Sequence, residues 1–174
     1  MDNKSIIKNM RADMHKGFRL LLDAYQEKLY WHLRRLLGSH DDASDALQET
    51  FIRIYRNFDS FKGDASSLTS WIFRIATNEA MRMIERRPEP MVQIDDDSTV
   101  HPLADEYVDY SDLEAVKLQK AILALPPKQR AVFNMRYYDE LSYQEIADAV
   151  DTSVSAVKVN YHLAKEKIVN AIKS

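Results

Sequence analysis

The feature that most constrains this fold is one acidic, proline-containing segment between two stretches of helical periodicity. Residues 88–111 hold three prolines and the run Asp95-Asp96-Asp97, without an apolar repeat of helical spacing. On both sides of this segment, apolar residues recur every three or four positions, as on one face of an α-helix. Prolines and clustered like charges favour a linker. The pattern predicts an all-α chain of two small helical domains: an N-terminal helical bundle (1–88), an acidic flexible linker (89–111) and a C-terminal four-helix domain (112–174).

Composition narrows the classes of fold and function. Only three of the 174 residues are Gly, which favours helices over tight β-turns, and a hydrophobic content of 45% is sufficient for a core. The absence of Cys excludes a disulfide framework, a thiolate metal site and a Cys nucleophile. No apolar run approaches the length of a membrane span, and the N-terminus lacks the apolar centre of a signal peptide. We therefore expect a cytoplasmic protein.

The charge is unevenly distributed along the chain. The net charge is −3, yet residues 89–116 contain nine acidic residues and no Lys or Arg, so the parts on either side are mildly basic. Fully extended, a linker of about two dozen residues spans roughly 80 Å. The linker is therefore either a solubilising tether or a device that places the two domains on separate sites of one target.

The N-terminal bundle is expected to begin with a frayed lead-in over residues 1–15. A core helix follows over residues 16–37, and Gly38 is expected to end it. The next helix begins near Asp41 or Asp42, either of which can cap it. Its polar face is either a solvated face with favourable charge at a helix N-terminus or a docking surface for a protein partner. This face carries Asp42, Asp45, Gln48, Glu49 and Arg53.

A polar loop over residues 59–67 is expected to join this helix to a third one, over residues 68–87. Gly63 permits a backbone turn that other residues resist, and Ser67 or Thr69 can cap the third helix. Phe61 either tucks onto the domain or stacks with a ligand, and Trp71 is either core or stacking platform. Aromatic residues beside Arg suit single-stranded nucleic acid, because every base offers a face on which to stack. The polar positions expected off the buried stripe of the third helix include Ser70, Arg74, Thr77, Asn78 and Arg82.

The C-terminal domain begins with a capping box in which Ser111 pairs with Glu114, followed by a helix over residues 112–124. Pro127 suits the first turn of the next helix, over residues 128–138. A second capping box, Ser142 with Glu145, opens the helix after that.

The pattern of the last two helices indicates a helix-turn-helix. The turn at residues 151–153 is short, and Ser153 is expected to cap the final helix, over residues 154–172. The alternative is a generic helical hairpin. In the DNA-reading kind, the exposed residues near the start of the final helix face a major groove. These are Ser155, Ala156, Lys158, Val159 and His162.

Catalytic chemistry has no support in these motifs. There is no Glu-x-x-His pair, the five His are scattered along the chain, and no Gly-rich phosphate loop is present. We expect no catalytic residue, no metal, no cofactor and no small-molecule substrate. A non-enzymatic helical adaptor is a further alternative.

In three segments, the sequence resembles an extracytoplasmic-function (ECF) sigma factor, the smallest type of bacterial RNA polymerase sigma subunit. The resemblance covers about residues 15–174. DASDALQETFIRIY, starting at Asp42, resembles the clamp-binding helix of that family. FKGDASSLTSWIFRIATNEA, starting at Phe61, resembles its promoter-melting loop and −10 reading helix. LPPKQRAVFNMRYYDELSYQEIADAVDTSVSAVKVNYHLAKEKI, starting at Leu125, resembles its −35 reading domain.

The resemblance implies a subunit that binds core RNA polymerase through clamp and flap, directs it to promoter DNA and helps to open that DNA. Polymerase docking would fall to Asp42, Asp45, Gln48 and Glu49. The opened −10 strand would be held by Phe61, Lys62, Gly63, Ser66, Ser67, Ser70, Trp71, Arg74, Asn78 and Arg82. The −35 groove would be read by Ser153, Ser155, Ala156, Lys158, Val159, Asn160 and His162.

Two further expectations follow from the resemblance. The acidic linker would run through the polymerase cleft, and an anti-sigma protein is the expected regulator, which would hold the chain at the inner membrane face if it is membrane-anchored.

One departure from the family concerns the final helix, where Ala156, Asn160 and Leu163 stand at positions that many members fill with Gly and two Arg. Readout would then fall to Lys158, Asn160 and His162, or to DNA shape. The rival hypothesis is a stand-alone helix-turn-helix transcriptional regulator.

Overall fold

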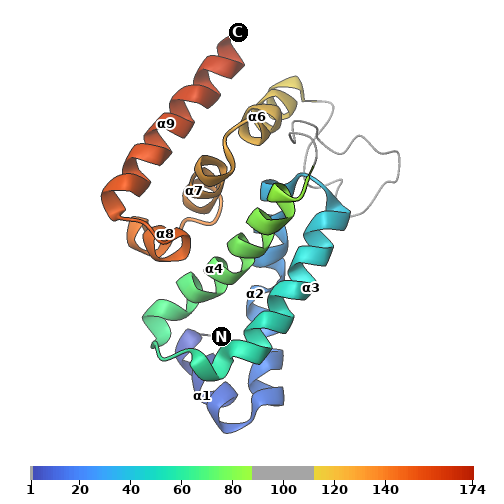
Figure 1. The fold of residues 1–174 in the computed structure, drawn as a ribbon, viewed down its shortest axis with the longest axis vertical. Helices are drawn as coiled ribbons and strands as arrows, with labels where there is room; N and C mark the ends of the chain where they lie inside the picture. Colours follow the sequence, from blue (N-terminus) through green and yellow to red (C-terminus); the bar gives the residue numbers. More distant parts are fainter. Residues whose placement is uncertain (1, 88–111) are drawn as a thin grey trace.

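The structure, a computed structural model, describes residues 2–87 and 112–174. Within these ranges it contains eight α-helices, one short 3-10 helix and no strand (Figure 1). The N-terminal half consists of α1 (Asn3–Ala12), α2 (Met14–Leu37), α3 (His40–Asn57), η1 (Phe58–Ser60) and α4 (Ala65–Glu85). The C-terminal half consists of α6 (Leu113–Leu123), α7 (Pro127–Tyr137), α8 (Tyr143–Val150) and α9 (Val154–Lys173). The all-α expectation is confirmed, and the expected linker lies outside the described residues.

Helix α1 corrects the expectation of a frayed lead-in. The Asp2 carboxylate caps it by accepting the Ser5 N–H at 2.8 Å. Ile6 and Met10 are buried, with exposed fractions of 0% and 2%. A helix of this length is marginal alone, because most helical stability in proteins comes from tertiary packing. Here α2 and α4 supply the surfaces against which α1 packs.

Several helices begin at a different residue from the expected one. Ser39, two residues ahead of Asp41, caps α3 through its side-chain oxygen, so Asp41 and Asp42 occupy the first turn. Asp64 caps α4 in place of Ser67 or Thr69. Asp112 caps α6, while the expected cap Ser111 lies outside the described residues. In each case the cap is the residue whose backbone is still extended where the first helical N–H groups lack partners.

The helix-turn-helix is confirmed in its geometry. Ser142 and Glu145 form the expected capping box at the start of α8, and Ser153 caps α9 by accepting the Ala156 N–H at 3.1 Å. Between the two helices, Asp151 adopts a left-handed conformation with φ of 55°. Asp tolerates this region better than most residues do, which allows a short turn without glycine.

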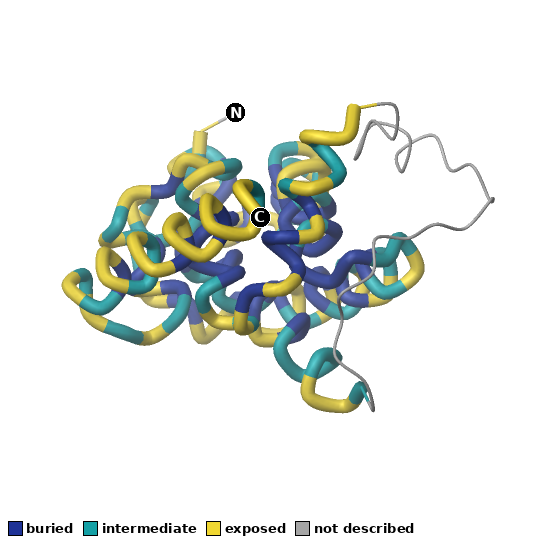
Figure 2. The backbone as a smooth tube through the Cα atoms, turned by 90° about the horizontal axis from the view of Figure 1, so that it is seen from above, coloured by how far each residue is buried: buried dark blue, intermediate teal, exposed yellow. Residues whose placement is uncertain are grey.

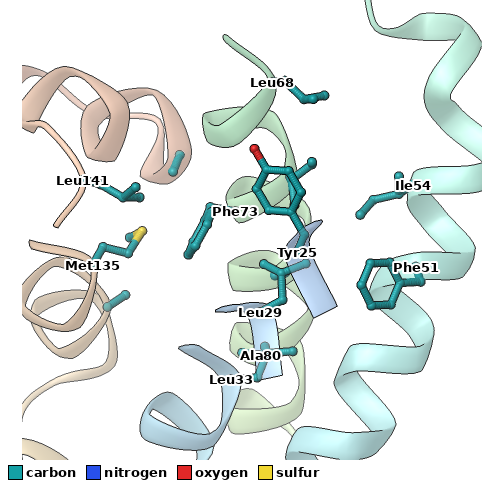
Figure 3. Packing of buried hydrophobic residues seen from close by; sticks show 14 of the residues in the cluster. Tyr25, Leu29, Leu33, Phe51, Ile54, Leu68, Phe73, Ala80, Met135 and Leu141 are labelled. Atoms are coloured by element: carbon teal, nitrogen blue, oxygen red, sulfur yellow. The ribbon is translucent and has the colours of Figure 1, made fainter. Parts of the chain in front are cut away.

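The two halves pack against each other. Helix α8 lies on α4, and α7 lies on α2. Met135 of α7 and Leu141 point toward Phe73 of α4, in a core shared by both halves (Figure 3). The buried stretches lie inside the molecule and the exposed ones form its outside (Figure 2). Each fully buried side chain of this size stabilises the packing by about 1.5–3 kcal/mol.

Polar contacts also cross this junction. The buried Arg130 guanidinium of α7 donates to the Leu36 carbonyl of α2 at 2.6 Å. His32 of α2 is fully buried and lies 3.5 Å from the Asp139 carboxylate, with its other ring nitrogen 2.9 Å from the Thr77 hydroxyl. These contacts hold the C-terminal half against α2, while α8 covers one face of α4.

Candidate nucleic-acid interface

Packed aromatic rings support the loop between α3 and α4. Phe61 is only 7% exposed, and its ring centroid lies 5.9 Å from that of Phe58 and 5.0 Å from that of Trp71. Phe61 therefore tucks onto the domain and supports the loop from inside. Trp71 is half-buried against Phe61 and lines a hollow next to it.

Gly63 serves close approach and not an unusual backbone conformation. Among the described residues, Gly38 is the only glycine with positive φ. A Cβ atom at Gly63 would lie 2.0 Å from the Ser67 hydroxyl oxygen and 2.9 Å from the Phe61 ring. The expectation of a special turn at Gly63 is thus wrong, since the glycine instead lets the loop pack against its own aromatic support.

The start of α4 is held by hydrogen bonds around its N-cap residue, Asp64. The Ser66 hydroxyl donates to the Asp64 carboxylate at 2.6 Å, and the Ser66 N–H donates to the same oxygen at 3.0 Å. These bonds hold the pKa of the Asp64 carboxyl below its usual value. The Ser67 hydroxyl accepts the Asp64 N–H in return, so Ser67 shapes the loop while Ser66 stays exposed.

A hollow of about 420 Å³ lies beside the loop, between α4 and the C-terminal half. One wall consists of the loop and α4, including Lys62, Trp71 and Arg74. The opposite wall belongs to the end of α8 and the turn after it, including Asp148 and Asp151. A half-exposed aromatic ring beside two cations suits a base and its phosphate.

The candidate residues of α4 differ in exposure. Asn78 is exposed, and Arg82 bonds to Glu79 at 2.8 Å. Arg74 pairs with Asp151 at 3.1 Å. The structure corrects the placement of two other residues that we expected off the buried stripe. Ser70 and Thr77 are buried, at 5% and 3% exposure, because α8 and α2 respectively pack on that part of α4.

The polar face of α3 is only partly free for docking. Asp45 and Gln48 are exposed. Glu49 pairs with Arg53 at 3.2 Å, and Asp42 forms an ion pair with Arg87 at the end of α4. Asp42 therefore also ties α3 to α4, which is a structural role that spacing did not reveal.

The start of α9 presents its candidates outward. Ser153, Ser155, Lys158, Val159 and His162 are exposed, whereas Ala156 and Asn160 are half-buried. His162 lies 3.3 Å from the Glu166 carboxylate, whereas Lys158 forms no ion pair with a carboxylate of the described residues, so Lys158 is the candidate cation best placed for a phosphate.

Sequence reasoning missed two groups of charged residues near the loop. Asp148 and Asp151 of the opposite wall carry no local signal, because only the packing of α8 on α4 brings them there. The cations of α1 were not predicted because residues 1–15 were expected to be a frayed lead-in and not a helix. Within residues 2–87 and 112–174, no three potential metal ligands cluster and no helix is long and apolar enough to cross a membrane.

Comparison with known proteins identifies the family. The model of Sigma-70 region 2 matches residues 21–88, and that of Sigma-70, region 4 matches residues 115–168. The ECF RNA polymerase sigma factor SigW of Bacillus subtilis (strain 168) is 32% identical over 177 residues, which cover 95% of this chain and 94% of SigW. The chain belongs to the ECF sigma factors. As such, it binds core RNA polymerase and promoter DNA and directs the enzyme to promoters.

Other similar proteins agree with this assignment. The ECF RNA polymerase sigma-E factor of Escherichia coli (strain K12) is 30% identical over 184 residues, covering 99% of this chain and 95% of that protein. Among solved structures, CnrH in complex with the cytosolic domain of CnrY superposes with a TM-score of 0.75, at 19% identity over 98% of this chain and 97% of CnrH. The sigma factor RpoE of Bartonella quintana, in complex with the anti-sigma factor NepR, gives a TM-score of 0.71 at 23% identity, over 91% and 98% of the two chains. These two structures share the fold.

Proposed function

We propose that three surfaces of this ECF sigma factor divide the work of promoter opening. The polar face of α3 docks on the polymerase clamp, the α3–α4 loop with α4 holds the opened −10 strand, and α9 lies in the −35 major groove. The observation that carries the proposal is the hollow beside the loop, where the half-buried Trp71 lies with Lys62 and Arg74.

The physical basis of opening would be differential binding. Taking a base out of the stack costs a few kcal/mol. Stacking on an aromatic ring returns about 1–3 kcal/mol per base, and nearby cations neutralise phosphates. The loop therefore favours the opened strand over the duplex, and the chain needs no catalytic residue of its own for this step.

The hollow must change before a strand can enter it. Asp148 and Asp151 form its second wall, and their carboxylates would repel DNA phosphates. We propose that α8 moves away from α4 when the protein binds polymerase. The Arg74–Asp151 ion pair is a surface pair, which contributes about 0–1 kcal/mol, so the main cost of this movement is exposure of the shared core around Phe73 and Met135, which polymerase binding would have to offset.

Regulation by an anti-sigma protein is part of the proposal. Both neighbouring structures named above were solved with a bound partner protein, and for RpoE that partner is an anti-sigma factor. Such a partner would have to cover the docking face or the two DNA-binding surfaces. Because core polymerase and promoter DNA are its targets, we place the protein in the bacterial cytoplasm.

A paired substitution tests the docking surface. Asp45→Ala with Gln48→Ala removes two exposed polar side chains of α3 and leaves the core intact. We expect this variant to bind core polymerase at least 10-fold more weakly, with an unchanged melting temperature. The matched control is Gln26→Ala with Glu27→Ala, an amide and an acid exposed on α2. Equal affinity of the two variants for polymerase would reject α3 as the dock.

A further inference from the structure

We propose that α1 is a phosphate-binding element for the single strand that the α3–α4 loop holds. Its exposed cations, which we name the α1 strip, are Lys4, Lys8 and Arg11. This inference rests on the proposed function, because the adjacent loop is its source of single-stranded DNA. Helix α1 lies ahead of residues 21–88, which the region 2 model matches, so that match assigns α1 no role.

Helix α1 is anchored directly to the start of α4. The Asn3 side-chain amide donates to the Ala65 carbonyl at 3.2 Å and to the Thr69 hydroxyl at 3.1 Å. The Tyr25 hydroxyl lies 2.7 Å from the Asn3 side-chain oxygen and 2.8 Å from the Thr69 hydroxyl. These bonds, together with the buried Ile6, fix the strip relative to the loop. A preorganised surface loses less entropy on binding than a mobile tail does.

The three cations share one face of the helix. Lys4, Lys8 and Arg11 are four and three residues apart, the spacings that align side chains along one side of an α-helix. All three are exposed, and none forms an ion pair with a carboxylate of the described residues. On α4, by contrast, Arg74 and Arg82 are engaged by acidic partners. The strip therefore offers its charges to an external anion.

Two hollows join the strip to the loop. One, of about 580 Å³, lies between the strip and the start of α4 at Asp64 and Ala65. The other, of about 790 Å³, is lined by Arg11, by Arg56 at the end of α3 and by Lys62 of the loop. Arg11 borders both hollows, and its guanidinium lies 3.4 Å from the Gly63 carbonyl. A concave path thus leads from the loop along α1, bordered by cations and lined also by the apolar Ile7, Ala12 and Ala65.

The acidic residues on this path leave it net positive. Asp64 is already bonded by Ser66, and Asp59 lines the larger hollow together with its three cations. A groove of positive charge that follows a flexible polyanion is the usual form of a single-strand binding surface. The DNA backbone is therefore the occupant that fits.

An acidic protein segment is the competing occupant. Figure 1 places α1 beside the loop end of α4, whereas the chain's own acidic segment begins at the opposite end of α4. Because α4 has 21 residues, its ends lie about 30 Å apart. The acidic segment is long enough to cover this distance but would first have to cross the length of α4, whereas DNA held by the loop would already lie beside α1, so proximity favours DNA.

The test uses holoenzyme made from core polymerase and this chain, with fork-junction DNA whose single strand is lengthened one nucleotide at a time beyond the segment held by the loop. The variant carries Lys4→Ala, Lys8→Ala and Arg11→Ala. The control carries Lys117→Ala, Lys120→Ala and Lys128→Ala, which removes the same charge from exposed positions of α6 and α7. Circular dichroism and thermal melting check that α1 stays folded.

We expect wild type and control to gain affinity as the strand lengthens, and the α1 variant to show no gain while binding the shortest DNA normally. Loss of three phosphate contacts should reduce the slope of log affinity against log salt concentration by about 2. Between 50 and 200 mM salt, the affinity of the wild type for long DNA should therefore fall ~20-fold more than that of the variant. Neutral methylphosphonate linkages in the added nucleotides should weaken wild type only.

Three results would overturn the inference. The first is an α1 variant whose DNA affinity still rises as the strand lengthens, and the second is a control variant that loses this rise to the same extent. The third is an α1 variant that binds core polymerase more weakly but keeps the rise in DNA affinity, which would indicate a protein partner. If wild type itself fails to bind the shortest DNA, the proposed role of the loop fails instead, and the two failures are thereby distinguished.

Discussion

At the residue scale, Phe61 and Trp71 show how far spacing alone can predict a site. Phe61 was expected in the loop and Trp71 on the helix after it, and each was open between core packing and stacking. The structure buries Phe61 and leaves Trp71 half-buried beside the hollow. The difference arises because the loop packs its own Gly63 against Phe61, between Phe58 and Trp71, and helical spacing does not encode a contact made within a loop.

Lys158 provides a prediction at this scale. It is the candidate α9 cation without an acidic partner, so Lys158→Ala should weaken −35 duplex binding by holoenzyme and lower the salt slope by about one unit. Lys165→Ala, an exposed cation farther along α9, is the control. The measurement is the dissociation constant over a series of salt concentrations. An unchanged slope of log affinity against log salt concentration would show that Lys158 contacts no phosphate.

At the element scale, the sequence predicted the long helices well and their first residues poorly. Gly38 ends α2 as expected, with φ of 81°, because glycine is the residue that most often takes the left-handed conformation at a helix end. Helix starts were less certain because Ser39, Asp41 and Asp42 are all chemically able to cap α3. Helix α1 was missed because its short apolar face becomes stable only on α2 and α4.

Substitution of Gly17 tests the packing of α1 on α2, because packing and helix propensity predict opposite changes in the free energy of unfolding. A Cβ atom there would lie 2.2 Å from the backbone nitrogen of Met10, so Gly17→Ala must push α1 away from α2. Helix propensity alone would stabilise the protein by about 0.5–1 kcal/mol. We expect instead a destabilisation of about 1–3 kcal/mol from overpacking. Urea unfolding gives the sign, and a stabilised Gly17→Ala protein would contradict the observed crossing of the two helices.

At the scale of the whole molecule, the packing of the C-terminal half on α4 is the feature that sequence could not reveal. Arg130 contacts Leu36 across 94 positions of sequence, and such pairs leave no local pattern. Under the proposed function the C-terminal half would have to move, because Asp148 and Asp151 form the opposite wall of the hollow at the start of α4 and their carboxylates would repel DNA phosphates.

We therefore predict that the two halves separate in the holoenzyme. The chain contains no Cys, so Gln26→Cys on α2 and Asn170→Cys on α9 provide two unique exposed sites for fluorescent labels. Energy transfer between them should fall when core polymerase is added. A control pair within the N-terminal half, Gln26→Cys with Glu85→Cys, should not change. Unchanged transfer in an active holoenzyme with the first pair would disprove the separation.

The central claim is that this chain gives RNA polymerase its promoters. The most direct measurement is transcription in vitro from genomic DNA by core polymerase, with and without the purified protein, followed by mapping of the RNA 5′ ends. We expect start sites that appear only with the protein and that share two sequence elements upstream, one for α9 and one for the α3–α4 loop. The same start sites with core polymerase alone would contradict the central claim.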